Sequence, residues 1–172
     1  MNGKSKKAEE TIIETLSDDG TFPNNESLPL ILYKGAFAEG TSPDEMEEIL
    51  HQHGWGNDWR NGIYDYHHYH STAHEALLIY AGQAEVQLGG PQGIGQKVKA
   101  GDVIIIPAGV AHKKLSGSSD FACIGAYPPG QNFDMNYGKE GERPKADENI
   151  SRLAKPKTDP VYGKKGALTD KW

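Results

Sequence analysis

The stretch GIYDYHHYHSTAHEALLIYAG occupies residues 62–82 and contains four of the seven histidines of the chain. Side chains alternate in character from Ile63 to His70, and this period of two is typical of a β-strand. His68 and His70 are two residues apart, so a strand would direct both imidazoles from one face, about 6–7 Å apart at the backbone. That spacing allows two ring nitrogens to approach a single metal ion.

Two further residues complete a candidate ligand set. Glu75 begins the next apolar stretch, and a short turn after His70 would return its carboxylate to the histidine pair. His112 follows the turn of GDVIIIPAGVAH (residues 101–112), where a later strand begins. His74 is an alternative to Glu75, because it also follows His70 closely. Three imidazoles and a carboxylate suit one divalent transition metal ion, such as Fe, Mn, Ni, Zn or Co.

Glu75, Tyr64 and Tyr66 are the candidates for catalytic proton transfer. The strand pattern places both tyrosines on the inward face with the histidines, where we expect them to pack inside a barrel. Tyr127 lies near the end of the last clear strand and is interpreted as a core or pocket-wall residue. Arg60 is interpreted as one half of a surface ion pair, with a contact to a substrate carboxylate as the alternative.

Composition limits the class of protein. The length of 172 residues predicts one domain, and the net charge of −6 argues against nucleic acid or an anionic membrane as a partner. The one cysteine, Cys123, excludes an internal disulfide and reads as a core residue. We expect a cytoplasmic protein, because no apolar run reaches the roughly 18–20 residues of a membrane span and no secretory signal is visible.

The spacing of turn residues predicts an all-β fold with one short helix. The helix should begin after Ser42, which can form a capping box with Glu45, and end at Gly54. The expected strands other than Ile63–His70 are Thr11–Leu16, Leu28–Tyr33, Ala76–Leu88 with a bend at Gly82, Gln96–Lys99, Asp102–Ile106, His112–Leu115 and Phe121–Tyr127.

The composition changes along the chain and predicts three segments. Residues 1–10 are charged and are expected to form a disordered tail, and residues 11–137 should form the barrel with the N-terminal strands and helix. Residues 138–172 hold nine Lys or Arg against six Asp or Glu. This basic segment is expected to be an irregular extension that packs on the acidic barrel.

Two runs of the chain resemble the sequence motifs of the cupins. Gly62-x5-His68-x-His70-x4-Glu75-x6-Gly82 is similar to the first motif, and Gly101-x5-Pro107-x-Gly109-x2-His112 is similar to the second. The second motif usually ends with Asn four residues after its histidine, where this chain has Ser116. The stretches DDGTFPNN (18–25), GWGNDWRNGIYDYHHYHSTAHE (54–75) and DPVYG (159–163) are similar to the bacterial single-domain cupins of the YjlB group.

This resemblance implies a double-stranded β-helix, or jelly roll, with His68, His70, Glu75 and His112 as ligands of one metal ion. It implies no particular reaction, because cupins include enzymes, storage proteins and sensors. We expect a metal-dependent enzyme acting on a small polar or acidic molecule, with a dioxygenase-type oxidoreductase favoured over an isomerase. A non-catalytic protein that binds or senses a small ligand is the alternative. The family also implies a homodimer, in which the N-terminal strands could extend a partner's sheet.

Overall fold

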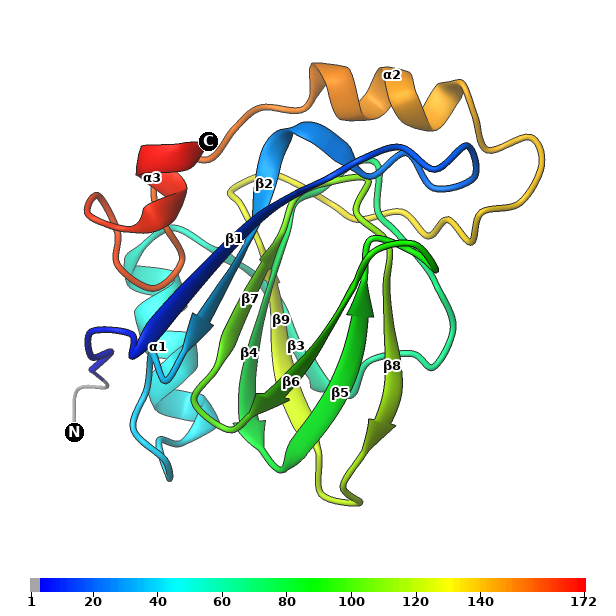
Figure 1. Ribbon diagram of the computed structural model, residues 1–172. Coiled ribbons are helices and arrows are strands. Elements are labelled where there is room, and N and C mark those ends of the chain that lie inside the picture. Colours follow the sequence, from blue (N-terminus) through cyan, green and yellow to red (C-terminus); the bar gives the residue numbers. More distant parts are fainter. Residues whose placement is uncertain (1–3) are drawn as a thin grey trace.

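Two antiparallel β-sheets form the body of the molecule in a computed structural model that describes residues 4–172 (Figure 1). Six strands form one sheet in the order β1-β2-β7-β4-β9-β3, and three form the other in the order β6-β5-β8. The strand bounds are β1 (Glu10–Leu16), β2 (Asn25–Lys34), β3 (Gly56–Asn61), β4 (Glu75–Ala81), β5 (Gln83–Leu88), β6 (Ile94–Lys99), β7 (Val103–Ile106), β8 (His112–Gly117) and β9 (Ala122–Tyr127). The expected all-β jelly roll is confirmed.

The long apolar stretch after the histidines bends where the sequence predicts. Gly82 separates β4 from β5 and has a φ of +71°, a conformation that favours glycine. A Cβ atom at this position would lie 2.4 Å from Ser118 Oγ and 2.8 Å from the Cα of Phe121. This bend carries the chain from the six-stranded sheet to the three-stranded sheet, so the two sheets close around the space between them.

Both faces of the six-stranded sheet are buried, because the side chains of its strands alternate between two apolar clusters. The inner cluster lies between the two sheets and includes Leu32, Leu77, Val86, Leu88 and Ile104. The outer cluster includes Tyr33, Leu50, Leu78, Val103 and Leu168. Double-sided burial explains why β7 is an unbroken apolar run instead of an alternating one.

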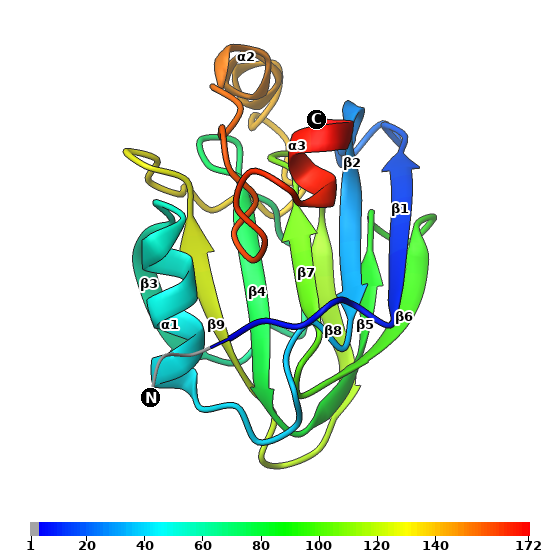
Figure 2. The ribbon, with the colours of Figure 1, turned by 90° about the vertical axis from the view of Figure 1, so that its left-hand side faces the viewer.

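Helix α1 (Pro43–Gln52) covers part of the outer face, in front of β3 and β9, and α3 (Ala167–Lys171) lies over β2 (Figure 2). The predicted capping box is confirmed: the Glu45 amide donates to Ser42 Oγ at 3.1 Å, and the Ser42 amide donates to Glu45 Oε2 at 3.0 Å. Among residues 4–172, no helix has both the length and the apolar character that crossing a membrane requires.

The N-terminal segment differs from the expected disordered tail over the residues that the structure describes. The Lys6 amide donates to the Ala36 carbonyl and the Glu9 amide donates to the Lys34 carbonyl, each at 2.8 Å. The Tyr162 hydroxyl also donates to the Lys6 carbonyl at 2.6 Å. Backbone hydrogen bonds to distant parts of the chain order this charged segment, which has few apolar residues of its own. The first three residues of the expected tail lie outside the described part.

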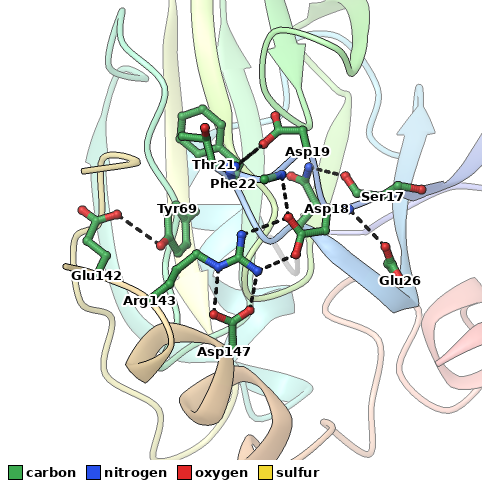
Figure 3. Close-up of polar contacts among 12 residues, drawn as sticks. Ser17, Asp18, Asp19, Thr21, Phe22, Glu26, Tyr69, Glu142, Arg143 and Asp147 are labelled. Carbon is green, nitrogen blue, oxygen red and sulfur yellow. Dashed lines mark hydrogen bonds and ion pairs between the residues drawn. The ribbon is translucent and has the colours of Figure 1, made fainter. Parts of the chain in front are cut away.

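The C-terminal extension runs along the barrel and contains α2 (Lys145–Arg152) as well as α3. Arg143 joins it to the loop between β1 and β2, because its guanidinium contacts both Asp18 and Asp147 (Figure 3). Nearby, the Tyr69 hydroxyl donates to Glu142 at 3.1 Å. These polar contacts hold the extension beside the segment that carries the histidines.

Candidate metal centre

Three histidines from two distant motifs meet inside the barrel. His68, His70 and His112 are all buried, and each offers a ligand atom within 4.8 Å of those of the other two. The backbones of His68 and His112 form an isolated antiparallel bridge, in which the His112 amide donates to the His68 carbonyl at 2.9 Å. This bridge aligns the first motif with the start of β8 and brings the predicted ligands together.

The segment that carries His68 and His70 is not the regular strand that we expected from Ile63 to His70. The chain bends at 65–66, and only His68 and Tyr69 form isolated bridges. Because the bend breaks the alternation of faces, Tyr64 and Tyr66 do not pack inside the barrel as expected. Their side chains are 54% and 40% exposed and stack on each other with ring centroids 4.9 Å apart. The role of either tyrosine in catalysis stays a prediction.

Each of the three imidazoles is held by a main-chain carbonyl at its Nδ1 atom. The acceptors are the carbonyl of Tyr66 for His68 at 3.0 Å, of Asp134 for His70 at 2.6 Å and of Val110 for His112 at 3.1 Å. A proton on Nδ1 leaves the lone pair on Nε2, which is the form that binds a metal ion.

The Nε2 atom of His112 is buried and has no hydrogen-bond partner among the described residues. A buried nitrogen of this kind is uncommon in a protein interior, and an ion is one of the groups that satisfies it. The three nitrogen donors therefore fit a divalent transition metal ion.

Glu75, the first residue of β4, lies beside the histidines. Its Oε1 atom is 3.2 Å from the Nε2 atom of His112 and 3.5 Å from that of His70. On the other side, the Tyr127 hydroxyl donates to Glu75 Oε2 at 2.8 Å and accepts a hydrogen bond from Trp59 Nε1 at 2.7 Å. Tyr127 ends β9, so a chain of hydrogen bonds from β3 and β9 orients this carboxylate.

Electrostatics favour the metal-binding forms of His68 and Glu75. At His70, burial acts to lower the pKa, but Glu75 and the Asp134 carbonyl outweigh it and raise this pKa, so a metal ion would have to displace a proton there. Burial, with a contribution from the neighbouring His112, lowers the pKa of His68 to about 3. Burial acts to raise the pKa of Glu75, but the attraction of His70 and His112 outweighs it and holds this pKa below its usual value. His68 is therefore a neutral donor and Glu75 an ionised one, as metal coordination requires.

A cavity of about 550 Å³ opens onto the four groups. Its wall also contains Trp59, Arg60, Asn61, Gly62, Ile63, Tyr64, Leu77, Lys114, Tyr127, Phe133 and Met135. The wall is mixed, with aromatic and aliphatic side chains beside a few polar ones. Such a cavity is large enough for a small molecule next to a bound ion.

The sequence profile of the family described as Cupin matches residues 60–132, which include both motifs. The chain is also 43% identical over 155 residues to a Bacillus subtilis (strain 168) protein, "Uncharacterized protein YjlB", with 90% of this chain and 92% of that protein covered. The chain belongs to the cupin family. The predicted membership, with its similarity to YjlB, is confirmed.

Solved structures with lower identity are similar to this cupin. The acireductone dioxygenase of Bacillus anthracis, solved with a cadmium ion in its active centre, is 13% identical at a TM-score of 0.43, with 74% of this chain and 83% of that chain covered. Procruciferin, an 11S globulin of Brassica napus, is 18% identical at a TM-score of 0.41, with 71% of this chain covered. This cupin spans 30% of the procruciferin chain. Neither likeness identifies a reaction.

His74, the alternative to Glu75, does not join the other histidines in this cupin. Its Nδ1 atom accepts a hydrogen bond from the Ala108 amide at 2.9 Å, and its ring packs against Trp172. Burial lowers the pKa of His74 to about 4. The ring therefore serves as a neutral packing group between the barrel and the C-terminal extension.

Arg60 forms the surface ion pairs that the sequence interpretation favoured. Its guanidinium contacts Asp44 and Glu47, both from α1. A substrate carboxylate would have to compete with these two acidic residues for the same charge.

Residues 132–136 contribute to the site of this cupin, and sequence reasoning did not identify them. Phe133 stacks on Tyr127 and lies 5.1 Å from the ring of His70, centroid to centroid. The Asp134 carbonyl holds His70, and the Asp134 carboxylate accepts from the Ser71 amide at 2.6 Å. A main-chain acceptor leaves no trace in the sequence, but the apolar Phe133 and Met135 on either side of Asp134 were a usable signal.

Proposed function

We propose that this cupin binds one divalent transition metal ion through His68, His70 and His112, with Glu75 as the fourth ligand. One observation carries the proposal: three buried imidazoles converge with their Nε2 atoms free of main-chain acceptors, and that of His112 has no hydrogen-bond partner among the described residues. When bound, such an ion would supply a Lewis acid with open coordination positions for a ligand.

The chain's own groups prepare the cavity for a small polar or acidic molecule. The main-chain acceptors hold the imidazoles, and Tyr127 holds Glu75 through its hydroxyl. Phe133 and Leu77 contribute apolar surface beside the histidines, which limits the water around a molecule in the cavity. Tyr64 lines the cavity and is 54% exposed, so it lies where the cavity meets solvent.

Dioxygenase-type oxidation is the reaction that we propose. Isomerisation requires a positioned acid and base. In the described part of the chain, Glu75 and Tyr127 are hydrogen-bonded to each other, and the side chains of Tyr64 and Tyr66 are exposed to solvent. Because these four residues form no free acid–base pair, a second candidate is also favoured, a protein that binds a small ligand at its metal ion without turnover.

Metal content and oxygen consumption together test the proposal. Protein purified without added metal should contain about one transition metal ion per chain by elemental analysis. The iron-loaded protein should consume oxygen with one member of a panel of catechols, thiols and 2-oxo acids, whereas the zinc-loaded protein should not.

The variants His112→Ala and Tyr64→Phe form a matched pair in this test. His112→Ala should lose the ion but keep the circular dichroism of the folded barrel, and Tyr64→Phe should keep the ion. Full metal content in folded His112→Ala would overturn the metal site. Binding of a panel compound without oxygen consumption would support the second candidate in place of the oxidation.

A further inference from the structure

Lys114 points into the barrel from the same strand as His112. In β8 these residues are two apart, so their side chains leave one face. Their partners in β5 are Leu88 for His112 and Val86 for Lys114, and both partners are buried in the inner apolar cluster. Lys114 accordingly lines the cavity with the candidate metal ligands.

The neighbouring Lys113 points the other way. It pairs with Gln87 and does not line the cavity. Its charge acts on His67, whose pKa is lowered first by burial and then by Lys113. The two adjacent lysines therefore extend from opposite faces of β8, and only Lys114 lines the cavity.

In the described part of the chain, no carboxylate forms an ion pair with Lys114. The other charged groups of the cavity wall are engaged, since Arg60 pairs with residues of α1 and Glu75 lies between Tyr127 and the histidines. Within residues 4–172, Lys114 has no ion pair, and its ammonium group lies 5.9 Å from the centroid of the Phe121 ring. Lys114 is half-buried, so an anion beside its ammonium group would be only partly screened by solvent.

The charges of Lys114 and Glu75 both affect the pKa of the buried Cys123 thiol. Burial raises the pKa of the Cys123 thiol, and the negative charge of Glu75 adds to this rise. The positive charge of Lys114 opposes it. Lys114 and the candidate metal ligands line the same cavity, so a molecule there would be exposed to both the ammonium group and the metal centre.

We propose that Lys114 binds an anionic oxygen group, a carboxylate or a phosphate, of the small molecule that this cupin takes into its cavity. Lys114 is then a specificity-determining residue that selects acidic compounds over neutral ones. This inference rests on the proposed function in placing the remainder of that molecule at the metal ion. Lysine is suited to the role because its compact charge can meet either kind of anion.

Matched pairs of acidic and neutral probes test this role. Zinc-loaded protein is titrated calorimetrically with pyruvate and pyruvamide, with 4-hydroxybenzoate and 4-hydroxybenzamide, and with glycerol 3-phosphate and glycerol. We expect at least one acid to bind about tenfold or more tightly than its neutral counterpart, as for a hydrogen bond to a charged group. The carboxylate pairs and the phosphate pair distinguish the two kinds of anion.

Three variants locate the preference. Lys114→Met should remove most of the preference for the acid, Lys114→Arg should keep much of it, and Lys113→Met should change it by less than about twofold. The inference is overturned if no acid binds, if the acid and its neutral counterpart bind equally, or if Lys113→Met and Lys114→Met have the same effect.

Metal content separates this inference from the proposed function. All three variants should contain as much zinc as the unmodified protein, because neither lysine is a candidate ligand. If the unmodified protein binds no metal yet prefers acids through Lys114, the proposed function fails and the anion site stands. If zinc is bound and Lys114→Met keeps the preference for acids, the anion site fails and the metal centre stands.

Discussion

At the scale of single residues, Tyr127 links the candidate metal centre to the wall of the barrel. Its hydroxyl donates to Glu75 and accepts from the indole of Trp59. Both partners are at least partly buried, so neither can replace the hydroxyl freely with bulk water. Outer groups of this kind fix the orientation of a ligand and commonly affect metal affinity by about 10–100-fold.

Tyr127→Phe removes this hydroxyl and keeps the ring. We expect metal affinity to fall by about 10–100-fold, because Glu75 loses the donor that orients it. We also expect the free energy of unfolding of the metal-free protein to fall by about 1–3 kcal/mol, since the buried Glu75 carboxylate and the partly buried Trp59 indole lose a partner. Competition with a chelator and urea denaturation measure the two effects. Tyr64→Phe, which removes an exposed hydroxyl, is the control, and equal affinities in the two variants would contradict the role of Tyr127.

At the scale of elements, the pairing of β3 with β9 places the Trp59 indole over a residue without a side chain. Trp59 and Gly125 are register partners, and a Cβ atom on Gly125 would lie 2.2 Å from Cζ2 of the indole. The glycine therefore determines where Trp59 lies in the cavity wall and where its N–H points.

Gly125→Ala should displace Trp59 from this position. We expect a loss of about 1–3 kcal/mol in the free energy of unfolding, as for other overpacked sites. The fluorescence of the displaced tryptophan should change as well. The control is Gly95→Ala, because a Cβ atom there would meet only Gln87 Oε1 at 3.6 Å. Unchanged stability of Gly125→Ala would show that the indole moves aside without cost.

Elements with a local signal could be predicted from the sequence, and those that depend on distant partners could not. The helix follows from the Ser42 cap, and the bend at Gly82 from a glycine inside an apolar run. The shape of the 63–70 segment depends instead on the backbone bridge between His68 and His112 and on the bend before it. Motif spacing still identified three buried histidines that converge, because that spacing reflects the fold and not the local strand geometry.

At the scale of the whole molecule, the C-terminal extension and the β1–β2 loop are joined by charge. Arg143 lies between Asp18 and Asp147, with all three side chains partly exposed (Figure 3). The hydrogen bond from Arg143 is the main reason why the pKa of Asp18 lies below its usual value. A depressed carboxyl pKa stabilises the folded state above the pKa of the unfolded state, and this stability is lost as the pH falls through the folded value.

Arg143→Met should therefore lower the free energy of unfolding at pH 7 by less than about 1 kcal/mol, because the pairs are partly solvated. The difference from the unmodified protein should shrink as the pH falls below about 4, where Asp18 becomes protonated. Thermal melts between pH 3 and pH 7 measure it. Lys145→Met, which removes an exposed cation 4.0 Å from Glu148, is the control. A difference that grows toward low pH would contradict the assignment.

A homodimer stays a prediction at this scale. In the described part of the chain, β1 is the outermost strand of the six-stranded sheet and pairs only with β2. A free edge of this kind can pair with the same strand of a second copy.

Light scattering at micromolar concentration should give twice the mass of one chain. Ile13→Lys should shift the mass toward one chain, and Leu115→Lys, on β8, should not. A single-chain mass for the unmodified protein would refute the dimer.

The three carbonyls that hold His68, His70 and His112 come from separate segments of main chain. A carbonyl persists whatever side chain its residue carries, so replacements at Tyr66, Val110 or Asp134 need not turn the imidazoles. The orientation of the three imidazoles thus depends largely on main-chain atoms, whereas the choice of a bound molecule depends on the side chains that line the cavity. In directed evolution, side chains of the cavity wall could be substituted to accept a new compound while the three imidazoles keep their orientation.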